Sequence, residues 1–196
     1  DGTVDTAYAP NFNGRVYAMA LQADGKVLVG GAFTEIGGES RRHLARLNPN
    51  GTIDSEFYPH FDGQVGTLVL QADGKILVGG TFNTVTPGKS TTPETRANLV
   101  RLNADGTLDA TFVPAGISFT GAVYAVAVQA ADNKILVGGQ FLAAGGPLLT
   151  TNISNVVRLN PDGSIDTSFY PGTGPDDTVD AIALQPDGKV ILGGSF

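Results

Sequence analysis

The chain has 196 residues, of which 12 are Lys or Arg and 19 are Asp or Glu, so its formal net charge is -7. It contains no cysteine, which excludes disulfide scaffolds, thiolate metal sites and cysteine nucleophiles. The acidic balance repels phosphate backbones, so nucleic acid is not expected as a partner, and no apolar stretch reaches the roughly 18 residues that insertion into a membrane requires.

Two sequence blocks recur along the chain. The first block contains Gln-Ala-Asp-Gly-Lys or a close variant, then an apolar run and Gly-Gly-x-Phe, and it begins at Gln22, Gln71, Gln129 and Gln185. The second block is Arg-Leu-Asn followed by an Asn-Gly or Asp-Gly turn, and it begins at Arg46, Arg101 and Arg158. Together they define repeats over 1–49, 50–104, 105–161 and 162–196, the last one incomplete. A period of roughly 50 residues indicates a repeat architecture.

The first half of each repeat predicts an antiparallel pair of strands. In repeat one, residues 16–21 alternate between small and large apolar side chains, and Val16 is counted with the small ones. Residues 26–33 are almost continuously apolar. Strands that are apolar on both faces are typical of sheets covered on both sides. Between them, Asp24-Gly25 predicts a two-residue hairpin turn.

The second half of each repeat predicts two more strands. The third strand carries Arg46 in repeat one, and Asn50-Gly51 predicts a tight turn into the fourth. No window shows the 3.6-residue period of a helix. The pattern therefore predicts an all-β fold, a β-propeller built of four-stranded antiparallel blades. A parallel solenoid is disfavoured because it would not place a hairpin turn between the first and second strands of every unit.

The two blocks also carry a family resemblance. Residues 184–196, Leu-Gln-Pro-Asp-Gly-Lys-Val-Ile-Leu-Gly-Gly-Ser-Phe, and residues 158–169, Arg-Leu-Asn-Pro-Asp-Gly-Ser-Ile-Asp-Thr-Ser-Phe, closely resemble the delta-60 repeat, a β-propeller family of large bacterial secreted and surface proteins. The resemblance spans nearly the whole chain. It implies a propeller in an extracellular bacterial setting, and it implies no enzyme activity or ligand, because the family is best known as one without assigned function.

One strand is missing from the set that a ring of four blades would need. The Arg-Leu-Asn strand occurs three times, whereas the hairpin of the first block occurs four times. Closing four blades into a ring would leave exposed sheet edges, which natural β-proteins avoid. We therefore expect part of a larger or multi-chain ring, in which further repeats or further copies complete the circle.

The arginines of the second block are expected to form structural ion pairs. They share one register on an apolar strand, and a buried guanidinium needs a partner. The expected pairs are Arg46 with Asp54, Arg101 with Asp109 and Arg158 with Asp166. Ligand binding by these residues is the less favoured alternative.

Other repeated polar and glycine positions predict turns and close packing. In Asn103-Ala-Asp105-Gly-Thr-Leu-Asp109 the oxygen-bearing side chains alternate as in a calcium loop, but the closing glutamate is absent. We therefore expect these aspartates to cap nearby amides, with calcium as the only cofactor left open. The Gly-Gly pairs are expected to mark close packing or a bulge instead of anion binding.

The loops at one rim of the blades differ between repeats and form the expected binding face. In an up-and-down sheet the two tight turns share one rim, so the variable segments gather on the other: 9–15, 34–43, 58–64, 83–97, 113–122, 142–155 and 170–178. The candidate binding residues there are Phe12, Arg41, Arg42, His43, His60, Phe61, Phe119, Asp176 and Asp177. Aromatic side chains of this kind stack on sugars or contact a protein surface. The alternative is that these residues only pack within their own loops.

These features predict a non-enzymatic, extracellular interaction or structural module of a bacterial secreted or cell-surface protein, with a protein or a glycan as partner. A carbohydrate-binding propeller is the alternative, and a propeller hydrolase or lyase is a more distant one. Neither histidine has a second histidine at metal-ligand spacing, and nothing marks a nucleophile. No catalytic residue and no metal ligand is therefore expected.

Overall fold

A computed structural model describes residues 2–3, 5–6, 8–114, 118–144 and 153–196. These residues form strands, turns and loops without a helix, so the all-β prediction is confirmed. It follows that nothing in this part of the chain forms a helix able to cross a membrane.

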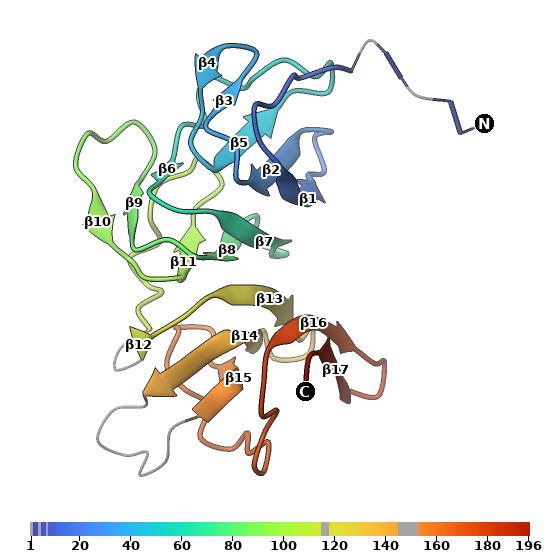
Figure 1. Cartoon of the computed structure of the whole chain (residues 1–196), viewed down its shortest axis with the longest axis vertical. Coiled ribbons are helices and arrows are strands. Elements are labelled where there is room, and N and C mark those ends of the chain that lie inside the picture. The colour runs from blue at the N-terminus through green and yellow to red at the C-terminus, as the bar shows by residue number, and fades with distance from the viewer. Residues whose placement is uncertain (1, 4, 7, 115–117, 145–152) are drawn as a thin grey trace.

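Four small antiparallel sheets, the blades, follow one another along the chain (Figure 1). Blade 1 contains β1 (Val16–Leu21), β2 (Val27–Gly31) and β5 (Leu44–Leu47), and blade 2 contains β7 (Val65–Leu70), β8 (Ile76–Gly80) and β11 (Leu99–Leu102). Blade 3 contains β13 (Val123–Val128), β14 (Ile135–Ala144) and β15 (Ile153–Leu159), and blade 4 contains β16 (Val179–Leu184) and β17 (Val190–Gly194). The rim loops add β3 (Glu35–Ile36), β4 (Glu39–Ser40), β6 (His60–Phe61), β9 (Thr84–Thr86), β10 (Glu94–Thr95) and β12 (Ser118–Phe119).

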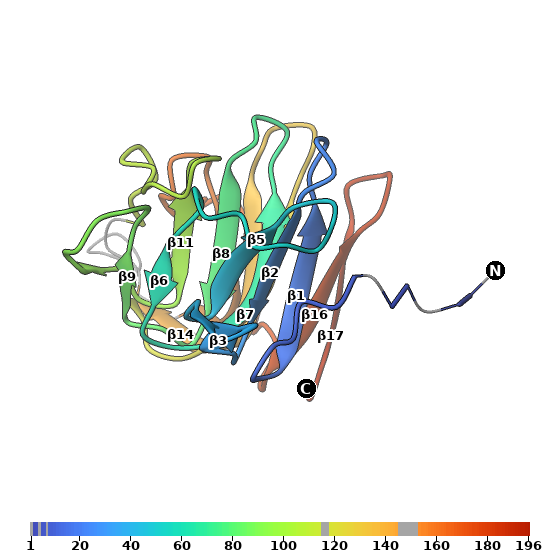
Figure 2. The same cartoon turned by 90° about the horizontal axis from the view of Figure 1, so that it is seen from above.

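The blades are arranged as a β-propeller arc that does not close (Figure 1). The first strands β1, β7, β13 and β16 line its concave side, and blades 1 and 4 form its two free ends. The hairpin turns between first and second strands lie together along one edge (Figure 2). The predicted fold class is therefore confirmed as an open run of blades.

The fourth strand, which was predicted for each complete blade without a length, is very short. It is reduced to one bridge per blade, namely Leu47 to Ile53, Leu102 to Leu108 and Leu159 to Ile165. In blade 1 the next residue, Asp54, accepts hydrogen bonds from the backbone amides of Glu56 at 3.1 Å and Phe57 at 3.3 Å. These local bonds turn the chain away from the sheet after a single bridge.

A β-bulge corrects the predicted alternation of the first strand. The pairing of β1 with β2 shifts between Val16 and Ala18. In blade 2 the counterpart of Val16 is Val65, which packs in the same core cluster as Leu68. Because a bulge adds one residue to a strand, Val16 lies on the face of the large side chains and not with the alanines.

The first tight turn also differs from its predicted length. The amide of Gln22 donates to the carbonyl of Lys26 at 2.8 Å, and the amide of Gly25 donates to the carbonyl of Gln22 at 3.0 Å. Gly25 has a φ of 81°, which places it in the left-handed region. The turn is therefore a three-residue loop closed by a glycine, and not a two-residue hairpin.

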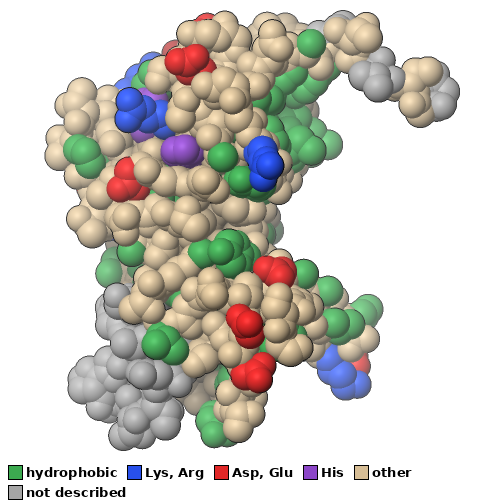
Figure 3. Space-filling model, viewed as in Figure 1, with side chains coloured by type: hydrophobic (Ala, Val, Ile, Leu, Met, Phe, Trp, Pro, Cys, Tyr) green, Lys and Arg blue, Asp and Glu red, His purple; other side chains and the backbone are tan. Residues whose placement is uncertain are grey.

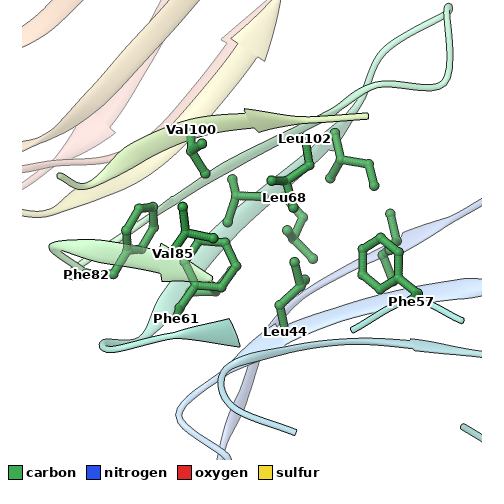
Figure 4. Close-up of a cluster of buried hydrophobic side chains, with 12 residues drawn as sticks. Leu44, Phe57, Phe61, Leu68, Phe82, Val85, Val100 and Leu102 are labelled. Atoms are coloured by element: carbon green, nitrogen blue, oxygen red, sulfur yellow. The ribbon is translucent and has the colours of Figure 1, made fainter. Parts of the chain in front are cut away.

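The apolar cores lie between successive blades. Figure 4 shows the cluster between blades 1 and 2, in which Leu44 of β5 is packed in one core with Leu68 of β7 and Val100 of β11. A second cluster joins blade 2 to blade 3 in the same way, with Leu77 of β8 against Val123 of β13. Blades 2 and 3 therefore each bury their two faces against two different neighbours, whereas blades 1 and 4 each pack against one.

Candidate functional site

Each complete blade carries a cluster of Arg, Asp and Lys. In blade 1 the Nε of Arg46 donates to Oδ2 of Asp54 at 2.7 Å, and Nζ of Lys26 lies 2.8 Å from the same oxygen. The guanidinium also lies over the ring of Phe57, 4.5 Å from its centroid. The equivalent clusters are Arg101, Asp109, Lys75 and Phe112 in blade 2, and Arg158, Asp166, Lys134 and Phe169 in blade 3.

The negative charge of each carboxylate in these clusters is balanced by the lysine and the arginine of the same cluster. Burial raises the pKa of Asp54, but hydrogen bonds from Lys26, Arg46 and the Glu56 amide together lower it to about 2. Asp109 and Asp166 have their pKa lowered against the same burial effect, chiefly by hydrogen bonds from the hydroxyl two residues on and from the paired lysine and arginine. The clusters therefore connect strands and offer no free carboxylate to a ligand.

The alternating oxygens of residues 103–109 serve the turn. Oδ1 of Asp105 accepts hydrogen bonds from the amide of Thr107 at 2.9 Å and from its hydroxyl at 2.7 Å. Asp109 faces Arg101 and Lys75 at 2.6 and 2.9 Å. Across the described ranges, no group of three or more Asp, Glu, His or Cys side chains is placed to hold a metal ion. This geometry gives no support to a calcium site.

The three candidate phenylalanines belong to the cores of their own loops. Each packs against the phenylalanine of a Gly-Gly-x-Phe segment: Phe12 on Phe33 at 4.9 Å, Phe61 on Phe82 at 4.6 Å and Phe119 on Phe141 at 4.9 Å between ring centroids. Phe61 and Phe119 are buried. This geometry favours the alternative given for these two rings, packing within their own loops, where they cover each loop's contact with its blade.

Between blades 1 and 2, the variable rim brings together a group of basic and aromatic side chains. The guanidinium of Arg41 is buried over the ring of Tyr58, 4.4 Å from its centroid, and His60 meets that ring edge-on at 4.2 Å. Arg42 and His43 follow directly in the chain. Figure 3 shows both histidines beside basic side chains on this part of the surface. We call Arg41, Arg42, His43, Tyr58 and His60 the rim cluster.

The rim cluster holds neutral histidines beside an exposed cation. Burial lowers the pKa of His43 and of His60, and the charge of Arg42 lowers both further. Nε of Arg41 and Nδ1 of His60 are buried without a hydrogen-bond partner in the protein. Arg42 is exposed, and its side chain has no hydrogen bond or ion pair within the described part of the chain.

The two candidate aspartates lie at another junction, between blades 3 and 4. Asp176 lines a cavity of about 360 Å³ together with Asn155 and Phe141. Oδ1 of Asp177 accepts a hydrogen bond from the amide of Thr178 at 2.7 Å, at the start of β16. These carboxylates are therefore not part of the rim cluster. The variable segments 113–122 and 142–155 include residues 115–117 and 145–152, which lie outside the described residues.

Sequence reasoning missed a second surface on the concave side of the arc. Tyr17 and Tyr124 occupy the bulge position of β1 and β13, and Gly66 occupies the same position in β7 between them. With Gln64 and Thr81 they line a cavity of about 280 Å³, which we call the tyrosine notch. Both tyrosines are exposed. The sequence does show the two tyrosines at the same position of two repeats. The alternation of small and large side chains, however, cannot reveal the bulge that turns both of them to this surface.

Comparison with known proteins places these repeats in a family. A family model described as "Domain of unknown function (DUF5122) beta-propeller" matches residues 22–57, 71–112 and 130–169. Each matched segment begins near the first tight turn of its repeat. It ends at the phenylalanine whose ring contacts the arginine of the second block, Phe57, Phe112 or Phe169. A search of the curated proteins finds no match.

Proposed function

Since the chain belongs to the DUF5122 β-propeller family, whose function is unknown, we propose that it is a non-enzymatic interaction module that binds an acidic partner at the rim cluster. The partner is a protein or a glycan that presents carboxylates. The resemblance of the two blocks to the delta-60 repeat supports a place in a bacterial secreted or cell-surface protein. Nucleic acid and membrane insertion are not part of this proposal, since the chain is acidic and its apolar stretches are short.

The proposal rests on Arg42, whose side chain is exposed and unpaired within the described residues, while hydrogen bonds hold the backbone on both sides of it. The amide of Arg41 donates to the carbonyl of Thr34 at 2.8 Å, and the amide of His43 donates to the carbonyl of Phe33 at 2.9 Å. These bonds fix the backbone on both sides of Arg42. A side chain on a backbone that is already ordered loses less conformational freedom on binding, and its charge selects acidic surfaces.

The contacts of the two histidines support a role without catalysis. Nδ1 of His43 lies 3.2 Å from the carbonyl oxygen of Gly31, and His60 packs on Tyr58. Within the described residues, neither imidazole has a hydrogen bond to a hydroxyl or a carboxylate. A hydrolase would need a base within hydrogen-bond reach of a nucleophile or a water-activating partner.

The test is binding of the purified chain to immobilised poly-glutamate and to immobilised polygalacturonate, measured by biolayer interferometry at low and moderate salt. We expect Arg42→Glu to weaken binding at least about 10-fold, because it replaces an attraction by a repulsion. Arg96→Glu is the matched control, since Arg96 lies on the next rim loop but is already paired with Glu94 at 3.1 Å. Equal losses in both variants, or no binding by the unmodified chain, would contradict the proposal.

The tyrosine notch favours carbohydrate binding as a second candidate function. Two exposed aromatic rings at the walls of a small cavity, with the Gln64 and Thr81 side chains beside them, suit the stacking and hydrogen bonding of a sugar. An array of neutral oligosaccharides should then give a signal that Tyr124→Ala removes. Tyr170→Ala, an exposed tyrosine on the loop before β16, should leave the signal unchanged.

A further inference from the structure

The two free ends of the arc present apolar faces of different shape. At one end, β1 exposes the large side chains Val16, Met19 and Leu21, with exposed fractions of 37%, 70% and 71%. We call this the head face. At the other end, the exposed positions are small apart from one isoleucine: Ala181 and Ala183 of β16, and Ile191 and Gly193 of β17. We call this the tail face.

The junctions inside the arc show how such faces fit. In blade 2 the counterparts of the head-face residues, Val65 and Leu68, are buried against blade 1. They meet its small face, which carries Ala18 and Ala20. The next blade repeats this arrangement, with Val123 and Val126 packed against blade 2. Large side chains of each first strand thus fill the hollows of the preceding blade.

A glycine in each second strand forms the deepest part of the hollow. A Cβ atom added at Gly79 would lie 2.6 Å from Cγ1 of Val123, and one added at Gly138 would lie 2.7 Å from Cγ1 of Val179. At Gly193, the equivalent position of blade 4, such an atom would meet only the Cβ of Ala181 at 3.8 Å. The hollow at Gly193 is therefore unfilled, and Val16 at the other end has no hollow to fill.

We propose that the head face of one copy binds the tail face of a second copy of this chain, with Val16 seated against Gly193 as Val123 is seated against Gly79. The surface is distinct from the rim cluster, so this proposal goes beyond the proposed function and does not depend on it. A head-to-tail contact between different patches can close into a ring.

Both halves of the argument for a second copy come from this one chain. The head face has the residue types that the tail face accepts at the internal junctions, and the tail face consists of β16 and β17, equivalent to strands that already accept a neighbour in blades 1 to 3. Neither set of named residues includes a charged side chain. Pairing the two faces therefore buries apolar surface without leaving a buried charge.

Sedimentation equilibrium of the unmodified chain from about 1 to 200 µM provides the first test, and it should give the mass of a dimer that dissociates on dilution. Gly193→Val and Met19→Lys are each expected to weaken dimerisation at least about 100-fold. The Gly193 side chain position is open within one copy, so the valine should not disturb the fold, which circular dichroism checks. Tyr170→Ser is the control and should dimerise normally. A monomer across the whole range for the unmodified chain would overturn the proposal.

Mixing the two variants tests the direction of the contact. Met19→Lys retains an intact tail face, and Gly193→Val retains an intact head face, so an equimolar mixture should form heterodimers although each variant alone is monomeric. A contact between two head faces predicts instead that Gly193→Val dimerises on its own. That result, or a mixture that stays monomeric, would overturn head-to-tail pairing.

Discussion

The hairpins of blade 2 and blade 4 contain the same repeated sequence block but have different surroundings. Leu77 of β8 is fully buried, whereas its counterpart Ile191 of β17 is 52% exposed. At the other end, Val65 is fully buried and its counterpart Val16 is 37% exposed. The side chains of a repeat are thus suited to two neighbours, and the presence of a neighbour decides whether they are buried.

The ion clusters show the same dependence on the next repeat. NH1 of Arg46 donates to the carbonyl of Ala104 at 2.6 Å, and NH1 of Arg101 donates to the carbonyl of Pro161 at 2.7 Å, each in the following repeat. NH1 of Arg158 instead contacts Oε1 of Gln129 within its own blade at 3.3 Å. As in other repeat architectures, stability is expected to be a sum of blade and junction contributions, with the end blades least stable.

The largest contrast is expected between an internal ion cluster and a surface ion pair. Asp54→Ala should lower the free energy of unfolding by about 3 to 4 kcal/mol at pH 7, because it leaves Arg46 and Lys26 without their carboxylate. Asp187→Ala removes a pair with Lys189 of similar length, 2.8 Å, but both side chains are at least half exposed, so the free energy of unfolding should stay nearly unchanged. Urea unfolding of the two variants measures both values.

Acid should remove most of the Asp54 effect. The pKa of Asp54 is lowered to about 2 in the folded chain, below its ordinary 3.8, so its ionised form stabilises the fold above pH 4. That contribution, on the order of 2 kcal/mol, is lost as the pH falls from about 4 to 2. The difference in stability between Asp54→Ala and the unmodified chain should shrink by about 2 kcal/mol over this range. A gap that stays constant with pH would show that the charge cluster is not its cause.

A valine at equivalent glycines should separate an internal junction from a free end. Gly79→Val places a side chain within 2.6 Å of Val123 and 2.7 Å of Thr67, so we expect a loss of about 3 kcal/mol from overpacking. Gly193→Val would meet only the Cβ of Ala181, at an ordinary contact distance of 3.8 Å, and should change stability by less than about 0.5 kcal/mol when measured at concentrations where the chain is monomeric. Similar losses in both variants would mean that the blade itself, and not its neighbour, requires the glycine.

The smallest contrast concerns the valine that fills the hollow. Val65→Ala should cost about 2 kcal/mol, because it removes two buried methyl groups and leaves a cavity beside Gly30. Val16→Ala should cost less than about 0.5 kcal/mol in the monomer, since Val16 is already in contact with solvent. Thermal unfolding in dilute solution compares the two, and an equal loss would contradict the view that Val16 lacks a partner.

Much of the blade could be predicted from local sequence, but details that depend on close approach could not. The Asp-Gly turns and the apolar hairpins indicated antiparallel strands in the right places. The bulge after Val16 was missed, because alternation cannot reveal an extra residue. The fourth strand forms only one bridge, because Asp54 accepts hydrogen bonds from the amides of Glu56 and Phe57 and the pairing ends there.

The candidate site was predicted less completely than the fold. Arg41, Arg42, His43 and His60 were selected from the variable loops. The structure packs Arg41 and His60 on the ring of Tyr58, which was not selected, and the charge of Arg42 acts on both histidines. Phe61 was selected as a surface ring, although it folds back onto Phe82. A loop's sequence shows that it differs from its counterparts, but it does not show which of its side chains turn inward.

The amino-acid sequence by itself determined the strands, the turns and the repeated residues that form ion clusters, because alternation, turn chemistry and short-range pairing depend on residues close together in the chain. Only the tertiary structure decided that the blades form an open arc, which faces remain uncovered, and which side chains of different repeats meet at the rim. Those outcomes depend on contacts between residues some fifty positions apart, about one repeat length, where the packing of one blade against the next sets the distances.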